Sequence, residues 1–260
     1  MRRGIWALAV AMALGAGAAH GGRTCEARPL DVFTVRQSMD LAQHTAKRLD
    51  ETGATVVVVA RAGQDLGRYG VYWSHMAFAY RERAGGPWRV VHKLNHCGTA
   101  NAAIYRQGLG EFFLDRMYRY EAGIVVLAPD AQAKLLPLLR DNYSVVRWNT
   151  DAYNMVAYPW SLRYQQSNQW VLETLAGAME PSATSRSRAQ GWLQMRDYQP
   201  ATLKIGAFER LGARVTAANV AFDDHPNEKR FSDRIETVTV DSAFTWLQRS
   251  GLGGPVIRVR

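Results

Sequence analysis

Apolar patterning in the first half of the chain predicts one helix and two buried strands. Across residues 31–52, apolar or small side chains recur at helical spacing, so we expect a helix that ends near Gly53. Residues 54–60 (ATVVVVA) and 122–128 (AGIVVLA) are almost wholly apolar and rich in β-branched side chains. Runs of this kind are typical of strands that are buried on both faces.

A β-hairpin is predicted between these two strands. Residues 72–80 and 88–94 alternate in character and flank a Gly-Gly turn signal. If the turn is centred near residues 83 and 84, His75 and His92 lie directly opposite each other, with Cβ atoms about 5 Å apart. Two interpretations remain open: the imidazoles form part of a functional site, or they are half-buried polar residues of the strands.

The remaining patterns complete an α+β fold. Residues 101–120 are predicted to be helical in part, and residues 153–166 are aromatic and irregular. The next helix starts at Ser167 or Asn168, both favoured N-cap residues, and runs to residue 179. Capping is therefore the simplest explanation for Ser167. Other predicted helices cover residues 129–142, 189–195, 203–211 and 241–249, and other predicted extended segments cover residues 144–148, 214–220 and 235–240.

The N-terminus carries the pattern of an export signal. A short basic segment is followed by an apolar run over residues 5–15 and by small residues, with cleavage expected between Ala18 and Gly22. The run is too short to span a membrane, and no later stretch is apolar enough to do so. We therefore expect a periplasmic or secreted protein with three parts, a signal peptide (1–21), a core with an N-terminal arm (22–180) and a C-terminal extension packed on the core (181–260).

Charge and cysteine content restrict the partners. The chain has 32 basic and 23 acidic residues and a formal net charge of +9. This charge either favours anionic envelope polymers and lipid head groups or reflects scattered surface arginines. There is no nucleic-acid motif, and we expect no cofactor. The two cysteines of an exported chain predict a Cys25–Cys97 disulfide, the alternative being that Cys97 is itself a nucleophile.

The hairpin and the later Ser167 helix together resemble a known superfamily. The hairpin SHMAFAYRERAGGPWRVVH resembles that of the circularly permuted NlpC-type, papain-like proteins, which include the lecithin:retinol acyltransferase-like branch. That family carries its nucleophilic Cys at a helix N-terminus, in the pattern Asn-Cys-x-x-Phe/Trp-Val. Here the matching segment is Gln-Ser-Asn-Gln-Trp-Val, so Ser167 replaces Cys and Gln166 replaces Asn. The resemblance covers residues 54–179, in the order of the permuted branch.

This resemblance implies a fold and a chemistry. It implies a permuted papain-like core in which the Ser167 helix packs against an antiparallel sheet. Ser167 would be the nucleophile, His75 its general base, and His92 the residue that orients His75. The free N–H groups at a helix N-terminus could stabilise an oxyanion. The whole chain also resembles an uncharacterised family of exported bacterial proteins, through FDDHPNEKRFSD and VTVDSAFTWL, which implies no activity.

Two functions follow as expectations. The first is a hydrolase or acyltransferase that acts on an amide or ester of cell-wall peptide or lipid. The alternative is a non-catalytic envelope protein that binds peptidoglycan, lipid or a protein partner. Tyr158, Trp160, Tyr164 and Gln166 precede Ser167 and are expected to line a substrate groove. The aromatic side chains around the approach to Ser167, which include Tyr153, could instead form a core.

A second polar cluster offers a competing site. Asp223, Asp224, His225 and Glu228 lie close together in the sequence and include metal-ligating residue types. Asp and Pro are also common turn residues, and Pro226 follows this cluster. We therefore favour a turn and predict no metal site.

Overall fold

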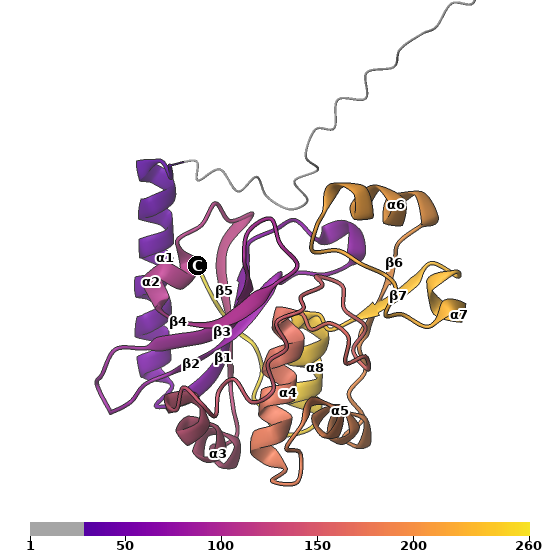
Figure 1. Cartoon of the computed structure of the whole chain (residues 1–260). Coiled ribbons are helices and arrows are strands. Elements are labelled where there is room, and N and C mark those ends of the chain that lie inside the picture. The colour runs from indigo at the N-terminus through magenta and orange to yellow at the C-terminus, as the bar shows by residue number, and fades with distance from the viewer. Residues whose placement is uncertain (1–28) are drawn as a thin grey trace, which may run out of the picture.

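A computed structural model describes residues 29–260 of the chain. The predicted signal peptide and Cys25 lie outside the described residues, so the structure bears neither on export nor on the predicted disulfide. The described part has an α+β fold, as predicted, with helices on both faces of one large sheet (Figure 1).

The large sheet is antiparallel throughout and has the strand order β4-β3-β2-β1-β5-β8. Its central strand, β1, is buried on both faces because its Val residues alternate between two apolar cores. The strands are β1 (Val56–Ala62), β2 (His75–Tyr80), β3 (Arg89–Asn95), β4 (Ala102–Gly108), β5 (Arg119–Val126) and β8 (Ile257–Val259).

Two helices cover one face of the sheet. They are α1 (Val32–Glu51), whose N-cap Asp31 accepts a hydrogen bond from the Thr34 N–H, and the short α2 (Leu109–Phe113). Leu41 and Leu49 of α1 pack with Phe112 of α2 on the small residues of β2. The alanines of β2 thus leave room for the close approach of this layer.

The larger core lies on the opposite face. Here α3 (Pro129–Arg140), α4 (Ser167–Met179) and α8 (Val240–Arg249) cover the sheet, and α5 (Arg186–Met195) packs on α4. Both α4 and α8 contribute side chains to this core, and Figure 1 shows them on the same side of the sheet. The predicted packing of the Ser167 helix against an antiparallel sheet is therefore confirmed, since α4 contacts β2 and β3.

A small second sheet forms most of the remaining C-terminal region. It pairs β6 (Ala201–Lys204) with β7 (Arg234–Thr237), accompanied by α6 (Ala207–Thr216) and α7 (Asn227–Arg230). The loop before β2 contains a short 3₁₀ helix, η1 (Gly67–Tyr69). Val71, two residues after η1, packs with Leu203 and Phe222 in a separate small core between the small second sheet and the large sheet.

Several predicted elements were wrong. Residues 101–120 are helical in part, as predicted, since residues 109–113 form α2. Residues 102–108 nevertheless form strand β4, because pairing with the free edge of β3 overrides a composition that resembles a helix. Residues 144–148 form turns rather than a strand. The predicted helix at 203–211 begins only at Ala207, since Leu203 belongs to β6, and the predicted strand at 214–220 begins instead with the last turn of α6.

Among residues 29–260, no helix combines the length and the apolar character needed to cross a membrane.

Candidate functional site

The two histidines of the hairpin are hydrogen-bonded to each other. The Nε2 atom of His75 lies 2.8 Å from the Nδ1 atom of His92. The strand register pairs Phe78 with Val91, so His92 lies across from Ala77 and diagonal to His75. The predicted directly opposed register was therefore wrong by two residues, but the imidazoles are long enough to meet along the diagonal.

A relay of hydrogen bonds continues from His92 into β4 and α2. His92 Nε2 lies 2.8 Å from Gln107 Oε1, and Gln107 Nε2 donates to Glu111 Oε1 at 2.9 Å. Because an ionised carboxylate only accepts, Gln107 turns its amide group toward Glu111 and its carbonyl oxygen toward His92. The N–H of neutral His92 therefore lies on Nε2, which leaves Nδ1 to accept a hydrogen bond from His75 Nε2–H. The proton-free nitrogen of His75 is then Nδ1.

Burial keeps both imidazoles neutral at pH 7. Burial lowers the pKa of His75 well below its usual value, with further lowering by His92 and by Arg61. Burial also lowers the pKa of His92 to about 4, opposed by the hydrogen bond to Gln107. Both rings lie near Phe112 of α2, with ring centroids 5.9 Å and 5.4 Å from that of Phe112. A neutral imidazole with one free lone pair can act as a base.

Ser167 is the first residue of α4 but not its cap. The N-cap is Gln166, and no side chain caps this helix end. The Ser167 Oγ lies 3.5 Å from the Tyr153 hydroxyl, the one hydrogen bond of this oxygen within the described chain. The side chain is only 6% exposed. Capping therefore does not explain Ser167, and its hydroxyl lies beside the uncapped N–H groups of the first helical turn.

Asn168 attaches the start of α4 to the start of β2. Its Oδ1 accepts a hydrogen bond from the Met76 N–H at 3.0 Å, and this N–H directly follows His75 in the chain. Paired residues of β2 and β3 begin only at Phe78 and Val91, so Asn168 takes the place of a β3 partner. The residues that follow His75 and Ser167 are thus in direct contact.

His75 and Ser167 line one cavity of about 740 Å³. The cavity lies between the start of α4, the loop around η1, and the small second sheet with α6. Its polar part includes Gln166, whose Nε2 donates to Thr237 Oγ1 at 2.5 Å. The walls are mostly apolar and include Leu66, Val71, Leu203, Ile205, Phe222 and Val238.

The two candidate catalytic side chains do not touch. No hydrogen bond joins His75 to Ser167 within residues 29–260. The His75 ring is directed toward His92 and Phe112, on the α2 side of the sheet, whereas α4 lies on the other side. The two residues share the cavity and the Met76–Asn168 contact, but not a direct bond.

The predicted substrate-binding residues separate into two groups. Gln166 lines the cavity, whereas Tyr158, Trp160 and Tyr164 are absent from its lining. The Tyr158 ring lies tilted beside that of His225, with centroids 5.4 Å apart, and Trp160 packs edge-on against Tyr198 beside the larger core. Tyr164 has the Arg163 guanidinium 5.2 Å from its ring centroid.

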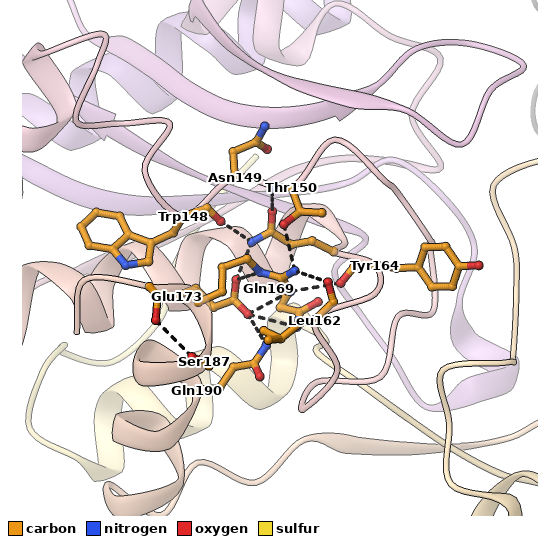
Figure 2. Close-up of polar contacts among 12 residues, drawn as sticks. Trp148, Asn149, Thr150, Leu162, Tyr164, Gln169, Glu173, Ser187 and Gln190 are labelled. Atoms are coloured by element: carbon orange, nitrogen blue, oxygen red, sulfur yellow. Dashed lines mark hydrogen bonds and ion pairs between the residues drawn. The ribbon is translucent and has the colours of Figure 1, made fainter.

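A buried ion-pair network holds the segment that leads to Ser167 (Figure 2). Glu173 of α4 is completely buried and accepts a hydrogen bond from the Nε of Arg186 at 2.7 Å. Arg186 also donates to backbone carbonyls of Ser161, Leu162 and Tyr164. Arg186 therefore fixes the irregular segment against α4 and α5.

Lys93 extends this network to the strand that carries His92. Its Nζ donates to Asn149 Oδ1 at 2.7 Å, to Gln165 Oε1 at 3.0 Å and to the Thr150 carbonyl. Gln165 Nε2 in turn donates to Glu173. Burial lowers the pKa of Lys93 to about 7, with added lowering by Arg186. The network thus connects β3, α4 and α5 through hydrogen bonds and an ion pair between polar side chains.

The competing acidic cluster is part of the structural framework. His225 Nδ1 lies 3.0 Å from Asp224 Oδ1, and its Nε2 lies 3.0 Å from the Glu236 carbonyl. Asp224 Oδ2 also accepts a hydrogen bond from the Tyr158 N–H. No group of three or more His, Cys, Asp or Glu within residues 29–260 is arranged to hold a metal ion.

Two residues of the site escaped the sequence analysis, Gln107 and Glu111. They lay in a stretch expected to be partly helical, so their place behind His92 had no sequence signal. Tyr153 was expected to lie beside the approach to Ser167, and its hydroxyl lies 3.5 Å from the Ser167 Oγ. Asn168 had a signal as an N-cap residue, but its Oδ1 accepts from β2 instead.

Comparison with known proteins places the chain in a bacterial family. No curated protein and no solved structure matches it. The model of a family described as "Uncharacterized protein conserved in bacteria (DUF2145)" matches residues 48–247, which include β1, the histidine hairpin, α4 and nearly all of α8. The chain therefore belongs to this DUF2145 family of bacterial proteins.

Proposed function

We propose that the protein is an exported hydrolase or acyltransferase that acts on an amide or ester bond, with Ser167 as nucleophile and His75 as base. One observation carries the proposal: an uncapped helix N-terminus presents a serine to the same cavity that His75 lines. The proposal includes a permuted papain-like core, which the antiparallel sheet, the adjacent histidine strands and the packing of α4 support.

The reaction would proceed through an acyl-enzyme. Ser167 Oγ attacks the carbonyl carbon of the substrate, and its proton passes to His75 Nδ1. The oxyanion is stabilised by free N–H groups of the first turn of α4. The C–N or C–O bond then breaks, and the leaving amine or alcohol takes the proton from His75. Water, or an acceptor alcohol or amine, then attacks the acyl-serine and gives its proton to His75. The acyl–Oγ bond breaks, and His75 returns the proton to Ser167 Oγ, which completes the cycle.

His92 acts as a positioning residue in this scheme. The Nδ1 atom of His92 accepts a hydrogen bond from the Nε2–H of His75. The basic lone pair of His75 is therefore kept on the Nδ1 atom of His75. Tyr153 has a complementary role. Burial raises the pKa of its hydroxyl, so this group stays protonated and can donate to the oxygen of Ser167 or to an oxyanion.

Substrate binding would have to bring His75 and Ser167 into hydrogen-bond reach. Catalytic hydrogen bonds are often long before the substrate binds and tighten in the reactive complex. Asn168 links the backbone beside Ser167 to the backbone beside His75, but the His75 ring would have to turn away from His92 and Phe112 to reach Ser167.

The apolar walls of the cavity favour a lipid ester over a peptide. Away from the polar end of the cavity at Ser167, most of the lining side chains are apolar. A bound peptide would require several hydrogen-bond partners for its backbone donors and acceptors. An acyl chain would bury apolar surface against these walls while its carbonyl lay at Ser167.

A non-catalytic binding function is the second candidate. It is favoured by the contact of Ser167 with Tyr153 rather than with His75. A serine hydroxyl is far less acidic than a thiol and depends wholly on its base for activation. Under this alternative the cavity holds a lipid of the envelope without turnover.

Labelling with a serine-directed fluorophosphonate separates the two. The enzyme proposal expects covalent labelling of the wild-type chain at Ser167, loss of labelling in Ser167→Ala, and at least tenfold slower labelling in His75→Ala. Ser74→Ala is the matched control, because Ser74 lines the same cavity and should not be the labelled residue. A wild-type chain that never labels, yet retains a lipid from an extract, supports binding alone.

A further inference from the structure

Helix α6 turns an apolar stripe toward solvent. Phe208, Leu211 and Val215 are 92%, 62% and 61% exposed. Their spacing of three and four residues puts them on one side of the helix. Helices of water-exposed domains normally turn such a stripe toward the core, and no residue of α6 is buried. Figure 1 shows α6 at the periphery of the molecule, above the small second sheet.

The other side of α6 covers the cavity. Glu209, Ala213 and Thr216 belong to the cavity lining. Glu209 is anchored there, since its Oε1 accepts from the Tyr69 hydroxyl at 2.5 Å and lies 2.9 Å from the Arg68 Nη2. One side of α6 thus lines an apolar cavity, and its opposite side carries the exposed apolar stripe.

The charges around the stripe are basic. Residues 201–216 contain three basic residues, Lys204, Arg210 and Arg214, and the single acid Glu209. Glu209 is paired with Arg68, and Asp233 is paired with Arg210 at 2.5 Å. Arg214, three residues after Leu211, is exposed and forms no ion pair with any residue of the described chain. A cation beside an apolar stripe is typical of helices that lie in the interface of an anionic membrane.

We propose that α6 docks the protein on an anionic phospholipid bilayer, with Phe208, Leu211 and Val215 inserted at the level of the acyl chains. A second copy of the chain fits less well. A ten-residue helix is about 15 Å long and offers on the order of 150 Å² on one side, whereas stable dimers bury about 800 Å² per partner. Docking would put α6, whose other side lines the cavity, against the lipid. The argument uses α6 alone and does not depend on catalysis at Ser167.

Co-sedimentation with large unilamellar vesicles tests the proposal. The purified chain, without its predicted signal peptide, should pellet with vesicles of equal parts phosphatidylglycerol and phosphatidylcholine. The triple variant Phe208→Ser, Leu211→Ser, Val215→Ser should bind at least tenfold more weakly. Met195→Ser is the matched control, because Met195 is an exposed apolar residue at the end of α5. It should bind as the wild type does.

Charge and oligomeric state separate the remaining outcomes. Arg214→Glu should weaken binding to the anionic vesicles severalfold, and added salt should do the same to the wild type. Ser167→Ala should bind normally, so a failure of the proposed catalysis leaves this result unaffected. Equal pelleting of the triple variant, or no pelleting of the wild type, overturns the proposal. A wild-type dimer by light scattering that the triple variant loses would assign the stripe to a second copy.

A labelled variant covers the case in which the triple variant does not fold. Leu211→Cys, carrying an environment-sensitive fluorophore, should show increased and blue-shifted emission on addition of the anionic vesicles. Met195→Cys with the same label should show no change. Equal responses at both positions would contradict insertion of α6.

Discussion

The Nε2 atom of His92 lies 2.8 Å from the Oε1 atom of Gln107, and this contact determines which nitrogen of each histidine carries the proton. Gln107 is held in its orientation by Glu111, so His92 must donate from Nε2. His75 must then donate to His92 and present a free lone pair on Nδ1. The basicity proposed for the site thus depends on two residues, Gln107 and Glu111, that are not part of the cavity lining.

The first prediction is the tautomer itself. At pH 7, long-range ¹H–¹⁵N correlation spectra should show His75 and His92 both neutral and both protonated on Nε2. In Gln107→Leu, the His92 N–H loses its acceptor, and the rate of fluorophosphonate labelling should fall about tenfold. In Gln107→Glu, the added negative charge should raise the pKa of His92 and move the pH profile of labelling upward. A proton on Nδ1 of His75 in the wild type would contradict the relay.

The second prediction concerns acid stability. The pKa of His92 is lowered to about 4 in the folded chain, against about 6.5 when unfolded. Between these values the unfolded state binds more protons, so stability falls as the pH decreases from about 6.5 toward 4. His92 alone should account for a loss of about 3 kcal/mol. His75 acts in the same direction, because burial also lowers its pKa.

Urea unfolding at pH 7 and at pH 4 measures this loss. The difference in unfolding free energy between the two pH values should shrink in His92→Gln. His96→Gln is the control, since His96 is an exposed histidine four residues away and should leave the difference unchanged. An unchanged difference in His92→Gln would show that other groups cause the acid sensitivity.

The third prediction concerns the Glu173–Arg186 pair. Glu173→Gln leaves the Arg186 guanidinium buried without its carboxylate, which should destabilise the fold by about 3–5 kcal/mol. Replacing both residues with Met should restore much of this stability, because no uncompensated charge remains. Thermal and urea unfolding measure both effects. The exposed Arg89–Glu82 pair, 3.2 Å apart, is the control, and Glu82→Gln should cost under about 1 kcal/mol.

Strands β1, β2, β3 and β5 of the large sheet and helix α1 were predicted well, because their patterns are strong, whereas β4 was expected to be partly helical and β8 was not predicted. Five successive apolar residues in β1 can only be buried, and α1 has both a periodic pattern and a capping Asp31. In the C-terminal region the helices at 189–195 and 241–249 are confirmed, but residues 201–220 were predicted poorly. Leu203 and Ile235 enter a strand pair whose partners are about thirty residues apart, and only that pairing distinguishes β6 from the start of a helix.

Sequence reasoning found residues of the candidate site only where the residue type by itself suggests a catalytic role. His75, His92 and Ser167 drew attention because imidazoles and a serine before an apolar helix suggest catalysis. Their supporting residues did not. Gln107 matters because β4 pairs with β3, a long-range contact that short-range periodicity does not encode. The cavity likewise lies between the large sheet and a C-terminal region whose elements were misassigned.

The fourth prediction concerns the close contact of α4 with Trp148. A Cβ added at Gly177 would lie 2.0 Å from a ring carbon of Trp148, which is almost completely buried. Gly177→Ala should therefore lower the unfolding free energy by about 1–3 kcal/mol or more. Gly191→Ala in α5 is the matched control, since a Cβ there meets nothing within 4 Å. That change should raise stability by about 0.5–1 kcal/mol, and a similar response at both positions would contradict the packing described.

The last prediction concerns the reactivity of position 167. In Ser167→Cys, the new thiol lies at the uncapped start of α4 and in the cavity that His75 lines. Both the helix N-terminus and a nearby imidazole lower a thiol pKa. We therefore expect alkylation by iodoacetamide well below pH 8 and faster than for a free thiol. Mapping of the alkylated peptide distinguishes this cysteine from Cys25 and Cys97.

Two further variants separate the contribution of the helix from that of the imidazole. Ser74→Cys lines the same cavity but does not begin a helix, so its thiol should react at an ordinary rate. His75→Ala in the Ser167→Cys background should slow alkylation several-fold, because the thiolate loses the imidazolium that stabilises it. If His75→Ala leaves the rate unchanged, the helix alone activates the thiol and the proposed His75–Ser167 pairing fails. Membrane docking through α6 would still stand, since it draws on no residue of that pair.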